Sequence, residues 1–191
     1  MATELDFNTK RGVTVDRHLE IAALNTGTRE APVWSPVGRR VEDSSLEIDW
    51  GVETSKDIFG ETYSTGQKST RTQTFDPWTL DSQDAAQKKI WNLGIRDDNV
   101  NELMNQDMLI CHFYAGGTEQ YTENFAERYE SCAVLPTSLG GAGGGSVGMS
   151  IEVTYGGKRT LGTVSRVDDV ITFTPGGTST EPASYSSKEV V

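Results

Sequence analysis

The segment Leu46-Glu47-Ile48-Asp49-Trp50-Gly51-Val52-Glu53 decides the fold, because apolar residues alternate along it with acidic ones. An alternation with a period of two is typical of a half-buried β-strand. We expect the buried face of this strand to carry Leu46, Ile48, Trp50 and Val52. The opposite, solvent-facing side would then carry Glu47, Asp49 and Glu53.

Two further extended segments follow this strand in the sequence. A turn-rich link runs from Thr54 to Glu61, and a second extended run, Thr62 to Phe75, is rich in threonine and polar on both faces. A strand without an apolar face is poorly specified on its own. We therefore expect neighbouring subunits to pair with this run or to pack on it.

One helix is predicted, from Ser82 to Leu93. Asp81 precedes it as the expected N-cap, Asp84 falls in its first turn, and Gly94 follows as the expected C′ glycine. Its apolar stripe consists of Ala86, Ile90 and Leu93. Trp91 either joins that stripe or reaches an adjacent subunit.

The remaining strands are shorter and are separated by turns. Val13–Leu24 suits a strand or a helix, and we favour the strand because Asn25-Thr26-Gly27 closes it as a turn. Ala31–Arg40 is interpreted as a loop anchored by Trp34, and Asp97–Asn105 as a polar connection. The later strands are predicted at Met108–Tyr114, Glu123–Leu135 (ended by Pro136), Val147–Tyr155, Lys158–Val164 and Val170–Phe173. Between them we expect a flexible glycine loop at Gly140–Gly148, a two-residue hairpin turn at Gly156-Gly157 and a turn at Asp168-Asp169.

Seven or eight strands with one short helix indicate a mainly β protein, a β-sandwich or β-barrel with one flanking α-helix. We expect an N-terminal arm over residues 1–12, a single domain over 13–174 and a flexible C-terminal tail over 175–191. The tail is rich in Ser, Thr, Gly and Pro.

The composition excludes several classes of function. The 191 residues carry a net charge of −11, which disfavours sequence-specific binding to nucleic acid. Cys111 and Cys132 are too few for a disulfide scaffold. Residues 1–12 lack the apolar core of a signal peptide, and no run approaches the ~18 apolar residues of a membrane helix. We therefore expect a protein that is made and assembled in the cytosol and does not enter a membrane.

No catalytic constellation or cofactor site is predicted. The only histidines are His18 and His112, and His112 follows Cys111 directly, so the two side chains point to opposite faces of a strand. The Gly140–Gly145 tract lacks the Lys-Ser/Thr ending of a phosphate loop. The acid pairs at residues 97–98 and 168–169 lack the ligand spacing of a calcium loop, and no set of four ligands suits zinc. We expect neither an enzyme nor a metal or cofactor protein.

Acidic residues concentrate between Glu42 and Glu61, where seven acids face one base, Lys56. One interpretation is an ordinary solvated strand face. The other is a wall that repels a polyanion, along which DNA slides without adhering.

Several phrases of the sequence resemble the major tail tube proteins of long-tailed, siphovirus-like bacteriophages. They are Asn25-Thr26-Gly27-Thr28, Ala31-Pro32-Val33-Trp34, Val37-Gly38, Val41-Glu42-Asp43-Ser44-Ser45-Leu46-Glu47-Ile48-Asp49, Glu53-Thr54-Ser55-Lys56-Asp57-Ile58-Phe59-Gly60, and Phe75-Asp76-Pro77 leading into the capped helix. The resemblance covers Leu19 to Leu93. From Met108 onward only the pattern of strands and glycines agrees.

The resemblance implies a virion protein of the phage tail, assembled in the host cytoplasm. Family members form hexameric rings that stack into a tube, through which genomic DNA passes into the host. The expected partners are further copies of the chain, the tape-measure protein, the tail tip or baseplate and the tail terminator.

The resemblance also assigns residues to roles. Glu47, Asp49 and Glu53, or their neighbours on the same sheet, are expected to face the lumen. The loop from Thr54 to Lys68 is expected to bridge rings, through Thr54, Lys56, Asp57, Ile58, Phe59, Tyr63 and Lys68. The terminal arms, Met1–Gly12 and Thr174–Val191, are further candidates for bridging. The flanking helix would lie on the side of the sheet away from the lumen, with Ala86, Ile90, Trp91 and Leu93 as its packing residues.

The main alternative is a monomeric β-sandwich module that binds carbohydrate or decorates a virion. Such a module would show an aromatic patch on one exposed face. The four tryptophans, Trp34, Trp50, Trp78 and Trp91, are scattered in the sequence and do not predict such a patch.

Overall fold

The fold is built on one strand, β8 (Asn124–Gly140), that belongs to two sheets. The structure is a computed structural model and describes residues 5–41 and 43–176. The other strands are β1 (Glu20–Asn25), β2 (Trp34–Pro36), β3 (Leu46–Asp49), β4 (Glu53–Lys56), β5 (Thr62–Thr65), β6 (Thr70–Thr79), β7 (Gln106–His112), β9 (Gly148–Tyr155), β10 (Arg159–Val167) and β11 (Val170–Pro175). All pairings between them are antiparallel.

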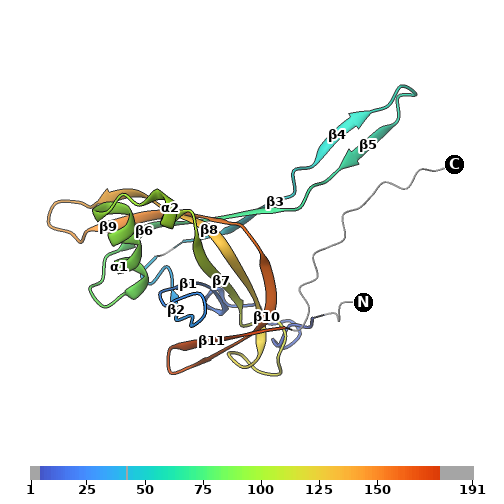
Figure 1. Cartoon of the computed structure of the whole chain (residues 1–191). Coiled ribbons are helices and arrows are strands. Elements are labelled where there is room, and N and C mark those ends of the chain that lie inside the picture. Colours follow the sequence, from blue (N-terminus) through green and yellow to red (C-terminus); the bar gives the residue numbers. More distant parts are fainter. Residues whose placement is uncertain (1–4, 42, 177–191) are drawn as a thin grey trace.

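The first half of β8 closes a barrel. Residues 124–129 of β8 pair with β10 on one side, and residues 125–132 pair with β7 on the other. The strand order β10-β11-β2-β1-β7-β8 then returns to β10, with a single bridge, Ile171 to Trp34, joining β11 to β2. The second half of β8, from Ala133 on, pairs with β9 instead and continues into a second sheet, β8-β9-β6-β3. We call this second sheet the open sheet (Figure 1).

Two apolar cores lie on the two sides of β7, and all seven residues of this strand are buried. Leu109 and Cys111 point into the barrel, where they pack with residues such as Leu19 and Val164. Met108 and Ile110 point the other way. There they join the apolar residues of the open sheet, among them Phe75, Trp78, Met149, Ile151 and Val153. The alternation predicted for residues 147–155 is confirmed from Met149 to Tyr155, while Val147 is half exposed.

The predicted fold class, mainly β with a flanking helix, is confirmed. The helix itself is shorter than predicted: α1 runs from Ala85 to Trp91 and continues as one π-helical turn, Asn92–Arg96. The N-cap is Asp84, whose carboxylate accepts from the Gln87 amide, and not Asp81, whose carboxylate closes a local turn at Gln83. Gly94 is not a C′ glycine. It lies within the π-turn, where an added Cβ would come within 2.5 Å of Pro136.

The predicted hairpin at Gly156-Gly157 is wrong. β9 and β10 do not pair with each other; both pair with β8, on successive parts of its length. Gly157 has a φ of 72°, and a Cβ there would lie 2.8 Å from the Ser131 backbone nitrogen. Glycine is required because the chain passes close to β8 as it crosses from the open sheet to the barrel.

Four other predictions about individual segments need correction. Val13–Leu24 is a strand only from Glu20, after a 3₁₀ turn at Arg17–Leu19. A short helix, α2 (Val100–Leu103), interrupts the predicted polar connection and is capped by Asn99. The predicted loop at residues 31–40 contains β2. Finally, Pro136 does not end β8, because that part of β8 pairs only with β9 and proline is tolerated on an unpaired strand edge.

Candidate assembly interface

The open sheet has one face that the body of the protein leaves uncovered. Cross-strand pairs place Ala133, Thr154, Thr72 and Glu47 in one row, and Leu135, Glu152 and Thr74 in the next. Because side chains alternate between the faces of a sheet, Thr70, Asp49, Asp76, Ser138 and Ser150 lie on the same side. We call this surface the open face. Threonine and serine hydroxyls dominate it.

All the charges on the strands of the open face are negative. They come from Glu47, Asp49, Asp76 and Glu152, and each of these residues is exposed. The one basic residue of β6, Arg71, points to the opposite side of the sheet, where it pairs with Glu127. A face with four carboxylates and no cation repels phosphates and offers no pairing partner to them.

Both edges of the open sheet are unpaired in the part of the chain that the structure describes. β3 pairs only with β6, and beyond Cys132 β8 pairs only with β9. An exposed strand edge is a template for pairing with another chain. The two edges are different, so a contact between them would be heterologous, the type of contact that generates rings or filaments.

A long hairpin leaves the body next to β3. We call residues 50–69 the hairpin arm; it contains β4 and β5, which pair only with each other. Figure 1 shows the arm extending away from both sheets. Every residue from Glu47 to Lys68 is exposed. A two-stranded hairpin is marginally stable alone in water, so an arm of this kind is expected to rest against another surface.

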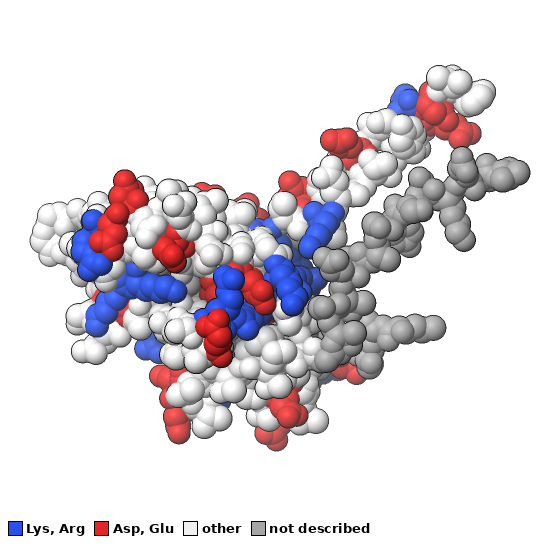
Figure 2. All heavy atoms as spheres, in the orientation of Figure 1, with Lys and Arg blue, Asp and Glu red and all other residues white. Residues whose placement is uncertain are grey.

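The tip of the arm presents two apolar side chains to solvent. Ile58 is 95% exposed and Phe59 is 85% exposed. The turn that holds them is well ordered by hydrogen bonds, because the Asp57 carboxylate accepts from the amides of Phe59 and Glu61, each at 2.9 Å. The acids Asp57 and Glu61 flank these two residues, and Figure 2 shows acidic (red) and basic (blue) side chains near this end of the arm.

The predicted burial of one face of the segment 46–53 is wrong for this isolated chain. Only Leu46 packs on a core, whereas Ile48, Trp50 and Val52 are 45%, 57% and 65% exposed. The reason is that β3 lies at the edge of the open sheet and the chain leaves the body after Asp49. The apolar alternation is real, but nothing within the described chain covers it.

The three residues predicted to face a lumen lie on two different parts of the structure. Glu47 and Asp49 lie together on the open face, opposite Thr72 and Thr70. Glu53 lies instead on the arm, beyond the turn at Gly51, which has a φ of 50°. Asp76 and Glu152 were not predicted. They come from strands about 75 residues apart in the sequence, so only knowledge of the β6–β9 register would have placed them beside Glu47.

The residues predicted to bridge rings all lie on the arm and are exposed: Thr54, Lys56, Asp57, Ile58, Phe59, Tyr63 and Lys68. The predicted link is a hairpin, with Tyr63 opposite Ser55 and Thr54 opposite Ser64. Of the predicted terminal arms, residues 5–12 touch the body, where Phe7 bridges to Ala115. Residues 1–4 and 177–191 lie outside the described residues.

The flanking helix α1 packs on the side of the open sheet that is opposite the open face. Ala86 and Ile90 are buried in the same core as Trp78 and Met149. Leu93 is only partly buried, and Trp91 is 36% exposed rather than part of the buried stripe. Of the other tryptophans, Trp34 and Trp78 are core residues, whereas Trp50 lies at the base of the arm.

A buried ionic cluster connects the open sheet to the barrel. Glu127 of β8 is 3% exposed and accepts from Arg71 at 2.5 Å, Arg159 at 2.8 Å and the Tyr129 hydroxyl at 2.7 Å. Burial alone would raise the pKa of Glu127, but these hydrogen bonds and the nearby His112 hold its pKa well below the usual range. The cluster fixes β6 and β10 to the same point of β8.

Two kinds of chemical group bear on reactivity, the cysteine thiols and the possible metal ligands. Cys111 and Cys132 are fully buried, and burial raises the pKa of the Cys132 thiol to about 12. Among residues 5–41 and 43–176, no three His, Cys, Asp or Glu side chains are grouped as metal ligands. Within the same ranges, no helix has the length and apolar composition needed to cross a membrane.

Comparison with known proteins gives structural similarities at low identity. One is to a chain in the cryo-EM structure of the sheath–tube complex of an extracellular contractile injection system, PVC, in the extended state: 13% identity, TM-score 0.47, covering 81% of this chain and 95% of that chain. Another is to the tube-terminating cap of the anti-feeding prophage: 15% identity, TM-score 0.48, with the same coverages. A third is to the PVC sheath/tube terminator: 12% identity, TM-score 0.46, covering 80% and 99%.

No protein-family model and no curated protein sequence matches the chain. TM-scores below 0.5 at such identities do not establish a common function, so we draw no functional conclusion from these similarities.

Proposed function

We propose that this chain is the structural subunit of a tail tube, which assembles into stacked rings around a conduit for DNA. The observation that carries the proposal is the open face: a hydroxyl-rich surface with four carboxylates and no base, on a sheet with two unpaired edges. Edge pairing between copies, β3 of one with β8 of the next, closes such sheets into one continuous wall.

The charge of the open face suits the lumen of the tube. DNA carries one negative charge per ~1.7 Å of helix axis, and a binding surface must supply cations to hold it. A wall of hydroxyls and carboxylates supplies none, so DNA moves along it without adhering. Glu47 and Asp49 are lumen residues in this proposal, together with Asp76 and Glu152, while Glu53 belongs to the arm.

The hairpin arm supplies the contact between rings. Its apolar side chains are exposed in the single chain, and contiguous exposed apolar surface on a soluble protein marks an interaction site. The sequence resemblance to tail tube proteins of long-tailed phages implies six copies of the chain in each ring. It also gives the tape-measure, tip and terminator proteins as the other partners in the virion.

Electron microscopy of the purified protein, together with sedimentation velocity over a range of concentrations, tests the proposal. We expect rings or tubes with a continuous inner wall and a negatively charged bore. The proposal is contradicted if the protein remains a monomer at every concentration and is also absent from tubular particles isolated from the cells that produce it. A bore lined by basic or apolar side chains contradicts it as well.

A further inference from the structure

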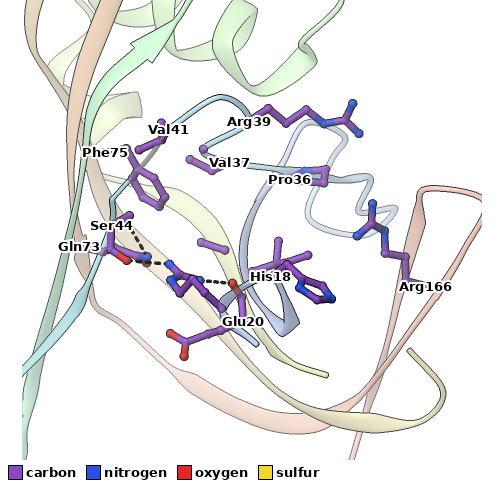
Figure 3. A pocket seen from close by; sticks show the side chains of 14 residues that line it. His18, Glu20, Pro36, Val37, Arg39, Val41, Ser44, Gln73, Phe75 and Arg166 are labelled. Atoms are coloured by element: carbon purple, nitrogen blue, oxygen red, sulfur yellow. Dashed lines mark hydrogen bonds between the residues drawn. The ribbon is translucent and has the colours of Figure 1, made fainter. Parts of the chain in front are cut away.

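A pocket with an apolar floor lies between β1, the loop that follows β2, and β6. Its volume is about 480 Å³, and Figure 3 shows Val37, Val41 and Phe75 along one side of it. Ile21 and Ala22 complete the apolar lining. A volume in the ~300–1,000 Å³ range accommodates a drug-sized group, so there is room for two large side chains.

The rim of this pocket is basic on a protein that is otherwise strongly acidic. Arg17, Arg39 and Arg166 line it from three separate segments, and Glu20 is the acid among the lining residues. Over the whole chain, by contrast, 28 acids outnumber 17 basic residues. The pocket is therefore suited to an apolar group that carries negative charge beside it.

Three arginines and a single acid, Glu20, line the pocket, so arginines outnumber acids among the lining residues. The Arg17 guanidinium donates to the backbone oxygens of Glu20 and Ser44, not to a carboxylate. Arg39 and Arg166 share Asp169, with the Arg39 contact at 3.7 Å, and Arg39 also interacts electrostatically with Asp84. Asp169 and Asp84 lie outside the pocket lining, so the lining itself keeps a positive balance.

The tip of the hairpin arm has the complementary composition. Ile58 and Phe59 are exposed apolar side chains, and Asp57 and Glu61 stand on either side of them. An apolar pair between two acids matches an apolar floor inside a basic rim, and this charge complementarity identifies the occupant of the pocket.

The arm is directed away from its own body (Figure 1), so its tip is placed to reach a neighbouring molecule. Eight residue steps separate Trp50 from Ile58, which gives a reach of up to about 26 Å in extended conformation. A domain of this size has a radius of gyration of about 15 Å.

We propose that the tip of the hairpin arm of one copy inserts Ile58 and Phe59 into this pocket of another copy, with Asp57 and Glu61 against the arginine rim. This inference rests on the proposed function, because it names the receptor for the arm in the assembled tube. It makes the contact specific, since tip and pocket are both built from the same chain.

Cysteine cross-linking tests where the tip docks. The two native cysteines are fully buried, so introduced ones react selectively. Chains that carry Ile58→Cys are mixed with chains that carry His18→Cys, a position on the pocket wall, at a protein concentration at which assembly occurs. The two kinds of chain differ in length, so that a mixed dimer is recognised by its mass. The matched control is Asn101→Cys, at an exposed position on α2. We expect a mixed disulfide dimer with the His18→Cys chain and at least ~10-fold less with the control, because an interface contact worth ~1.4 kcal/mol corresponds to tenfold occupancy.

A charge exchange tests the rim. Arg39→Glu and Glu61→Arg are each expected to raise the protein concentration needed for assembly by roughly tenfold, and the double variant to recover to within about threefold of wild type. Arg96→Glu is the matched control, because Arg96 is about as exposed as Arg39 and also pairs with an aspartate. It is expected to leave assembly unchanged.

The outcomes separate this inference from the proposed function. The docking site is overturned, and the tube proposal is kept, if tubes form but the cross-link is equally strong at both positions and the double charge variant shows no recovery. Failure of the wild-type chain to form rings or tubes, together with its absence from tubular particles isolated from the cells that produce it, overturns the proposed function. Thermal unfolding of each variant shows whether an assembly defect is instead a folding defect.

Discussion

Removing the two apolar side chains at the arm tip should strongly weaken assembly without destabilising the monomer. The double substitution Ile58→Ser with Phe59→Ser acts on side chains that are 95% and 85% exposed. Exposed substitutions of this kind change the free energy of unfolding by about 0.5 kcal/mol or less. The chain should therefore unfold at the same denaturant concentration as wild type.

The effect on assembly follows from the surface that the tip would bury. Complete burial of an Ile or a Phe side chain is worth about 1.5–3 kcal/mol each. If half of that is realised at the contact, the double variant loses about 1.5–3 kcal/mol for each arm. This corresponds to a decrease of roughly 10- to 100-fold in the association constant.

The assay measures the critical concentration for polymerisation by light scattering and pelleting, with electron microscopy of the products. The control substitutes serine for Val100 of α2 and for Met104, which directly follows this helix; the two apolar side chains are 57% and 51% exposed. A double variant at the tip that assembles as readily as wild type, or that loses more than about 1 kcal/mol of monomer stability, refutes the reasoning.

Three other sets of substitutions have expected outcomes. Glu127→Gln should cost about 3 kcal/mol at pH 7, because it leaves two arginines without their shared carboxylate. The pKa of Glu127 is lowered in the folded state, so the ionised carboxylate stabilises the fold fully above about pH 4.3, the unfolded pKa, and this stabilisation is lost as pH falls. The free energies of unfolding of the variant and wild type, measured in urea, should therefore converge at acid pH. Gly157→Ala should destabilise by roughly 2 kcal/mol or more because of its positive φ and the close β8 backbone. Gly60→Ala, with a positive φ but open space, should cost about 1 kcal/mol, and urea unfolding of both variants measures the difference. Glu47→Lys with Asp49→Lys should leave tubes intact but slow the release of DNA in an ejection assay, and unchanged release would count against a lumen position.

The sequence predicted strands better than it predicted what covers them. The alternation in residues 46–53 correctly placed a strand at β3 and put Glu47 and Asp49 on one face. It could not show whether Ile48 and Trp50 are covered by the same chain, because periodicity assigns residues to a face and says nothing about the partner of that face. Those two residues are exposed here because β3 is an edge strand.

Other errors arose where one residue type serves two purposes. Asp81 and Asp84 are three residues apart and both suit a helix N-cap, but the Gln87 side chain accepts from the Asp81 amide, so the helix begins after Asp84. Gly156 and Gly157 suit a tight hairpin equally well as a close crossing of another strand. The open face could not be assembled from sequence, because its four carboxylates lie on three strands whose register is set only by tertiary pairing.

The shared strand β8 limits how far this chain can be shortened. The first half of its 17 residues pairs with strands of the barrel, and the second half pairs with a strand of the open sheet. A shortened chain that keeps only the open sheet would lose the strands that pair with the first half of β8. The open sheet therefore depends on the barrel, and neither can be removed or exchanged as an independent module.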